Sequence, residues 1–108
     1  MIVFIENYEQ YVMLYFEDGH HELRNQKLCE LGHFVKEDHK YKTPIQIGND
    51  LLYPTQSKKE YDCCWVNYDA LDCSHVFLLQ LLKQKQLLDK VLNAYLMQKK
   101  NHLLNLCQ

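Results

Sequence analysis

The most constraining feature of this chain is its C-terminal third, because residues 74–108 contain neither glycine nor proline. Leucines recur there on one broad stripe while lysines supply the charge, a pattern typical of an amphipathic helix. One unbroken helix from Ser74 to Leu104 would be about 45 Å long at roughly 1.5 Å per residue. A compact domain of this size has a radius of gyration of only about 13 Å. We therefore expect either a break near Gln84-Lys85-Gln86 or a far end that packs on a second chain.

The rest of the chain has the opposite character, with short runs rich in β-branched and aromatic residues. Asp18-Gly19 predicts a tight turn, since glycine accepts positive φ at no steric cost. A short helix is expected from Asn25 to Leu31, with Gly32 as its C-cap. Strands are expected at residues 2–5, 11–16, 20–24, 34–35, 45–47, 51–53 and 61–68.

The predicted fold class is α+β, with a small antiparallel sheet in the N-terminal two-thirds and a long helical C-terminus. A length of 108 residues and an apolar share of 47% favour one domain over residues 1–108. Within it, residues 1–73 are expected to be mainly β with one short helix, and residues 74–108 to be helical.

Targeting signals are not apparent in the sequence. Apolar runs such as Val76–Leu79 are far too short to span a membrane, so no membrane partner is expected. The first residues lack both a basic start and a small-residue cleavage site. Five cysteines, an odd number, fit a reducing compartment better than a disulfide framework. A cytoplasmic location is the expectation.

Metal binding is the first chemical possibility. Cys29 with His33 and Cys73 with His75 form two pairs that together offer four zinc ligands. Their spacings differ from the usual C-x2-C and H-x3-H, and the alternative is that the cysteines serve as small hydrophobic residues. The prediction is no metal site and no cofactor, with zinc at these four residues left open.

Catalytic signatures are absent from the sequence. No nucleophile-elbow or protease pattern surrounds any cysteine, and neither G-x-G-x-x-G nor a Walker sequence is present. The vicinal pair Cys63-Cys64 lacks the C-x-x-C spacing of redox helices, and one side chain is expected on each face of a strand. The protein is therefore not expected to be an enzyme.

Lysines in two polar segments are the best candidates for contact with nucleic acid. They lie on either side of the strands expected at residues 45–53, where loops on a sheet scaffold often carry binding residues. Acidic residues are mixed among them and the net charge is −2, so a solvated loop of mixed charge is the alternative. The candidate DNA-binding residues are Lys36, Lys40, Lys42, Lys58 and Lys59.

The stretch between and beside these segments resembles the competence transcription factor family. A Pro-Ile pair at Pro44-Ile45 is followed by a short hydrophobic strand that runs into Pro-Thr-x-Ser at residues 51–57, and then by Cys-Trp-Val at Cys64–Val66. The likeness covers about thirty residues, roughly 42–71. It implies a regulator that activates genes by binding AT-rich promoter DNA and is controlled through proteolytic adaptors. Family members are usually longer, and a strand-rich section replaces the leucine-rich tail seen here.

A protein-binding module is the competing hypothesis. The acidic net charge and the amphipathic tail favour a small inhibitor or adaptor, of phage or plasmid origin, that binds a protein partner. The tail also predicts a homo-oligomer formed through the C-terminal helix. The residues expected to mediate self-association are Leu88, Leu92, Tyr95 and Leu96.

Overall fold

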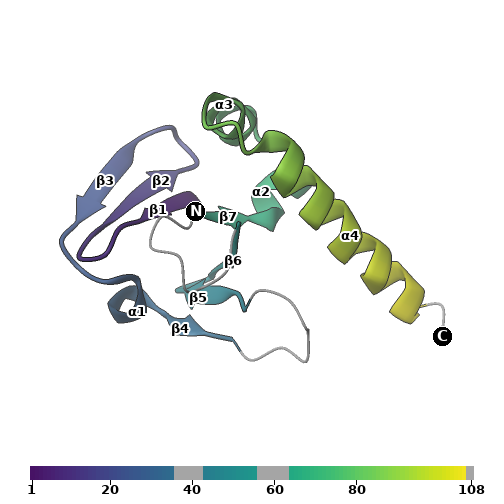
Figure 1. The fold of residues 1–108 in the computed structure, drawn as a ribbon, viewed down its shortest axis with the longest axis horizontal. Coiled ribbons are helices and arrows are strands. Elements are labelled where there is room, and N and C mark those ends of the chain that lie inside the picture. Colours follow the sequence, from purple (N-terminus) through teal and green to yellow (C-terminus); the bar gives the residue numbers. More distant parts are fainter. Residues whose placement is uncertain (36–42, 56–63, 107–108) are drawn as a thin grey trace.

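The computed structural model describes residues 1–35, 43–55 and 64–106, with side chains through residue 100. Within these residues the chain forms a curled antiparallel sheet with helices packed beside it (Figure 1). The strands are β1 (Ile2–Asn7), β2 (Val12–Phe16), β3 (His21–Arg24), β4 (His33–Phe34), β5 (Ile45–Ile47), β6 (Asp50–Pro54) and β7 (Cys64–Asn67). The helices are α1 (Leu28–Leu31), α2 (Tyr68–Asp72), α3 (Val76–Gln84) and α4 (Leu88–Leu106).

The sheet is a meander on each side of a central pair of strands. Its order is β3-β2-β1-β7-β6-β5-β4, and every neighbouring pair is antiparallel. The first strand, β1, therefore lies between β2 and the last strand, β7. Ile5 pairs with Trp65 and Phe4 with Val66 across this central junction.

One face of the sheet carries what we call the inner core. Neighbouring strand residues point to opposite faces, so Trp65 lies on this side while Val66 lies on the other. Trp65 is only 2% exposed, as expected for a core residue. Leu28 of α1 joins this cluster. The inner core comprises Ile2, Ile5, Val12, Leu14, Leu28, Ile45, Leu52 and Trp65.

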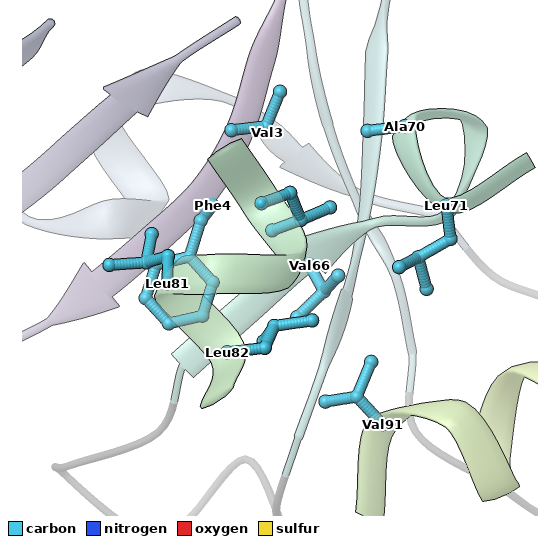
Figure 2. Packing of buried hydrophobic residues seen from close by; sticks show 9 residues of the cluster. Val3, Phe4, Val66, Ala70, Leu71, Leu81, Leu82 and Val91 are labelled. Carbon is cyan, nitrogen blue, oxygen red and sulfur yellow. The ribbon is translucent and has the colours of Figure 1, made fainter. Parts of the chain in front are cut away.

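The opposite face packs against α2, α3 and α4 and carries what we call the helix-side core (Figure 2). The register between β1 and β2 shifts between Ile2 and Phe4, which is a β-bulge. The bulge allows two successive residues, Val3 and Phe4, to reach this same face. The helix-side core comprises Val3, Phe4, Val66, Ala70, Leu71, Leu78, Leu81, Leu82 and Val91.

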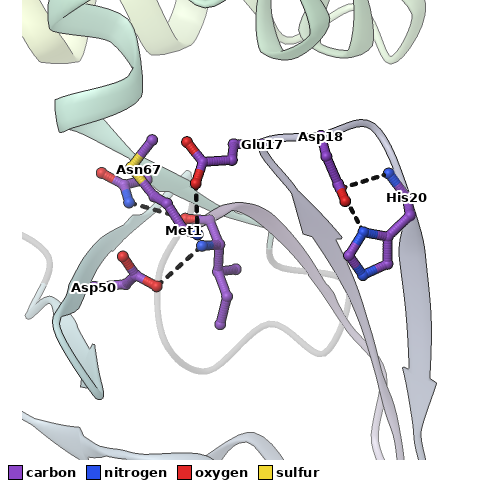
Figure 3. A network of polar contacts seen from close by, with 7 residues as sticks. Met1, Glu17, Asp18, His20, Asp50 and Asn67 are labelled. Carbon is purple, nitrogen blue, oxygen red and sulfur yellow. Dashed lines mark hydrogen bonds and ion pairs between the residues drawn. The ribbon is translucent and has the colours of Figure 1, made fainter.

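Polar contacts fix the start of β1 against β6 and β7 (Figure 3). The Ile2 backbone N–H donates to Asp50 Oδ2 at 3.0 Å, and Asn67 Nδ2 donates to the Ile2 carbonyl at 2.8 Å. The Asn67 side chain also accepts from the Asp69 backbone N–H at 2.9 Å, which caps α2. One buried amide thus joins the central strands and starts the helix layer.

Gly32 follows α1 as its C-cap, as predicted, but not in the left-handed conformation usual there. Its φ of −160° is extended backbone that any residue adopts. A Cβ at this position would instead lie 2.2 Å from the Gln46 carbonyl oxygen. Glycine is needed here because β5 approaches the backbone closely.

The C-terminal third contains the break that was one of the two expected outcomes. Gln86 has a φ of 59° and separates α3 from α4. The Gln86 N–H donates to the Lys83 carbonyl at 3.1 Å and the Leu87 N–H to the Leu82 carbonyl at 2.8 Å. These two bonds form a Schellman motif, in which glycine usually holds the left-handed position.

A Schellman motif also ends α2, the helix that precedes α3 in the chain. Ser74 has a φ of 51°, its N–H donates to the Leu71 carbonyl, and the His75 N–H donates to the Ala70 carbonyl. Two helix ends are therefore closed by residues other than glycine, which explains how a stretch without glycine or proline still folds as separate helices.

The predicted α+β class is confirmed in its broad outline and corrected in detail. The sheet is larger than expected, with seven strands among the described residues spanning Ile2–Asn67. The helical C-terminal region begins at Tyr68 rather than at Ser74, because Asn67 caps α2 directly after β7. The long helical C-terminus is divided into α3 and α4. Among the described residues, no helix is both long and apolar enough to cross a membrane.

Replacing Gln86 by glycine should stabilise the fold, because glycine adopts positive φ without the steric cost borne by other residues. We expect Gln86→Gly to raise the free energy of unfolding by about 0.5–1 kcal/mol in urea titrations. The matched control is Gln80→Gly, at an exposed position inside α3, which should lower it by about 1 kcal/mol. Destabilisation of both variants to the same extent would contradict the role given to Gln86.

Candidate functional site

The stretch that resembles competence factors, which we call the central motif, has its described residues (Pro44-Ile45, 51–55 and Cys64–Val66) in or beside three neighbouring strands, β5, β6 and β7. Ile45 pairs with Leu52, and Pro54 pairs with Trp65. The pair of β6 and β7 is closed at one end by Thr55, whose N–H donates to the Cys64 carbonyl at 2.8 Å. The Thr55 hydroxyl oxygen also accepts from the Cys64 N–H at 3.3 Å. Residues that are separated in sequence are thus hydrogen-bonded neighbours in the sheet.

The five lysines predicted to contact DNA lie outside the described residues, in segments 36–42 and 56–63. The strand ends on either side of these segments are described. The end of β4, the start of β5, the end of β6 and the start of β7 lie at the same end of these antiparallel strands. Val35 N–H donates to the Pro44 carbonyl at 2.9 Å, next to the pairing of β4 with β5. The contact between Thr55 and Cys64 marks the corresponding end of β6 and β7. In sequence, the segments with Lys36, Lys40, Lys42, Lys58 and Lys59 begin and end at these described strand ends.

The residues predicted to mediate self-association divide into two groups. Leu88, Leu92 and Tyr95 are half-buried and pack against the helix-side core of their own chain. Leu96 is 59% exposed and Met97, beside it, is 58% exposed. Leu96 is the one member of the predicted set that the fold leaves largely uncovered.

The four zinc candidates are not gathered into one site. Cys29 lies in α1 and His33 in the edge strand β4, whereas Cys73 and His75 lie between α2 and α3. The Cys73 thiol instead contacts backbone carbonyls of its own helix. Among the described residues no group of three or more His, Cys, Asp or Glu side chains is arranged to hold a metal ion.

A half-buried carboxylate, Glu6, ties β1 to the junction between α3 and α4. Glu6 Oε2 accepts from Lys85 Nζ at 2.8 Å and from the Tyr8 hydroxyl at 3.2 Å, and Glu6 Oε1 accepts from the Tyr15 hydroxyl. Burial alone would raise the pKa of Glu6, but the hydrogen bonds from Lys85 and Tyr15 outweigh it and hold the pKa below its ordinary value. The contact fixes the position at which α4 leaves the sheet.

Tyrosines join the first half of α4 to the sheet and to α2. Tyr53 stacks on Tyr68 with 4.4 Å between ring centroids, and Tyr68 meets Tyr95 edge-on at 5.5 Å. Burial, followed by the nearby Tyr53, raises the pKa of Tyr68 to about 12. Tyr95 donates to Asp72, which also binds Lys99 Nζ at 3.0 Å. The tyrosines therefore serve packing and helix positioning in this structure.

Hollows in the described surface are small. One of about 10 Å³ lies between Tyr53, Tyr68 and Lys90, enough for about one water molecule. Another of about 200 Å³ is lined by Glu6, Asn7, Tyr8 and Cys64. Both are below the range of about 300–1,000 Å³ typical of small-molecule sites.

Charge is distributed unevenly along the chain, a feature that the sequence motifs do not reveal. Residues 76–106 contain five lysines and one aspartate, a formal charge of +4. Because the whole chain carries −2, the remaining residues carry −6. Counting charge by segment would have revealed this asymmetry from the sequence alone.

Lys85→Met should weaken the attachment of the helices and alter the pH dependence of stability. We expect a loss of about 1 kcal/mol at pH 7 by urea unfolding, since Glu6 loses a charged hydrogen-bond partner. The folded-state pKa of Glu6 is lowered, so its stabilisation is present above the unfolded value near 4.5 and is lost as pH falls through the folded pKa. The variant should therefore lose less stability than the native protein between pH 6 and pH 3. Lys83 is an exposed lysine near the end of α3, so Lys83→Met is the control. Identical pH profiles of stability in the native protein and both variants would rule out this role for Glu6.

The chain was compared with protein-family models, with curated proteins and with solved structures, and none of the three comparisons finds a match.

Proposed function

We propose that this protein is a DNA-binding transcription regulator of the competence-factor type, with AT-rich duplex DNA as its partner. The observation that supports this best is that the described residues of the stretch that resembles competence factors lie in or beside three neighbouring strands, β5, β6 and β7. A resemblance carried by neighbouring strands is more informative than scattered matching residues.

Lysines give the proposed regulator its means of contacting phosphates. Segments 36–42 and 56–63 carry five lysines, and the strand ends that flank them in sequence lie at the same end of these antiparallel strands. Phosphate contacts supply most of the sequence-independent affinity of DNA-binding proteins. The proposal is for a binding protein without catalytic activity or cofactor, acting in the cytoplasm.

The salt dependence of DNA binding tests this proposal. We expect the native protein to bind an AT-rich duplex at low salt, with log affinity falling by about 0.9 per phosphate contact for each unit of log salt. If all five loop lysines contact phosphates, the slope is about −4.5 and their joint replacement by glutamine removes most of it. A GC-rich duplex of equal length measures sequence preference. Absence of binding to either duplex at low salt would refute the proposal.

A second copy of the chain is the alternative partner, and one observation favours it. Leu96 is 59% exposed on α4, beside half-buried Leu92 on the preceding turn. Pairing of two α4 helices along these residues would cover apolar surface that the monomer leaves in water. We propose this contact as the means of homo-oligomerisation, and a protein partner of another sequence would use the same surface.

Light scattering at high protein concentration tests self-association. We expect a dimer mass for the native protein and a monomer mass for Leu96→Lys, since a charge on this surface opposes its burial. Gln80→Lys adds the same charge at an exposed position on α3, away from Leu96, and should leave the dimer intact. A native protein that stays monomeric throughout the concentration range would exclude stable pairing through α4.

A further inference from the structure

Helix α4 has a second set of exposed side chains besides Leu96, which we call the stripe. Lys90, Asn93, Met97 and Lys100 follow one another at intervals of three, four and three residues, so they share one side of the helix. All four are exposed. Asn93, Met97 and Lys100 lie roughly opposite Val91, which is 3% exposed in the helix-side core, and point away from the protein's own packing. Lys90 lies at the side of the stripe, next to the hollow lined by Tyr53 and Tyr68.

The helix that carries the stripe projects from the sheet. α4 has 19 residues, about 28 Å of helix at roughly 1.5 Å per residue. In Figure 1 its C-terminal half extends beyond the sheet and beyond α2 and α3. Helix α4 is held to the fold by Val91, Tyr95 and Lys99, so the helix is anchored as far as Lys99 and the residues beyond continue from that base.

The lysines of the stripe differ from the other lysines of the helix layer. Lys85 binds Glu6 and Lys99 binds Asp72, so both have charged partners within the fold. Within the described part of the chain, Lys90 and Lys100 form no ion pair. The one acidic side chain of α4, Asp89, lies in its first turn, where the helix dipole stabilises negative charge. The stripe thus presents positive charge within residues 76–106, the +4 segment of an otherwise acidic protein.

We propose that this stripe is a DNA-contacting surface, with α4 lying in the major groove of the duplex. An α-helix about 10–12 Å across fits a groove about 12 Å wide. Lys90 and Lys100 neutralise phosphates, the Asn93 amide bonds an adenine edge, and Met97 contacts thymine methyl groups. The inference rests on the proposed DNA-binding function and assigns part of the contact to a helix outside the central motif.

Two sets of variants in the full-length protein test the stripe. We expect the double variant Lys90→Gln/Lys100→Gln to bind an AT-rich duplex about tenfold more weakly at 0.1 M salt and to reduce the salt slope by about 2. The control Lys27→Gln/Lys83→Gln removes the same charge from exposed positions outside the stripe and should change neither quantity. Asn93→Ala should reduce the preference for AT-rich over GC-rich duplex. Because all these positions are exposed, unfolding free energies should stay within about 0.5 kcal/mol of the native value.

The outcomes separate the stripe from the proposed function as a whole. Native binding with an unchanged affinity and slope in Lys90→Gln/Lys100→Gln overturns the role of α4 and leaves the loop lysines as the DNA contacts. No native binding to any duplex refutes both proposals together. Binding to phosphatidylserine vesicles in place of duplex, lost in the same double variant, would overturn DNA as the partner and identify α4 as a membrane-surface helix.

Discussion

The pairing of β1 with β7 is the interaction on which the rest of the structure depends. Without it the chain would be two separate meanders, β1-β2-β3 and β4-β5-β6-β7, neither of which encloses a core. The pairing joins residues far apart in sequence, such as Ile5 and Trp65, so folding must bear a large loop-closure cost before the contact is gained. Asn67 strengthens this junction through its bond to the Ile2 carbonyl.

The same junction organises both cores. The bulge in β1 directs Val3 and Phe4 to the helix side while Ile2 and Ile5 remain in the inner core. One central strand therefore supplies buried side chains to both faces of the sheet. The position of α4 also depends on β1, because Glu6 near its end holds Lys85 at the turn that precedes the helix. The direction in which α4 projects is thus set by a strand at the other end of the chain.

Local features of the fold could be predicted from the sequence, whereas its long-range order could not. β-branched and aromatic runs correctly placed the first two strands, and the Asp18-Gly19 turn is confirmed by a φ of 94° at Gly19. The break near Gln86 followed from comparing helix length with domain size. Its mechanism was hidden, because a Schellman motif with glutamine has no glycine signal. The placement of β1 beside β7 depends on tertiary pairing that no local pattern encodes.

The candidate site shows the same division between local and tertiary information. Leu88, Leu92 and Tyr95 match an exposed association stripe by helical spacing alone, but their own core partly covers them. The charge asymmetry, by contrast, needs no structure to detect. The charge asymmetry also affects the orientation in which any polyanionic partner would approach the protein. Residues 76–106 carry +4 and the remaining residues carry −6, so a duplex would be attracted toward α3 and α4 even though the net charge of the protein opposes approach. Uneven charge would then contribute orientation more than affinity, and affinity would depend on short-range contacts made after that orientation is reached.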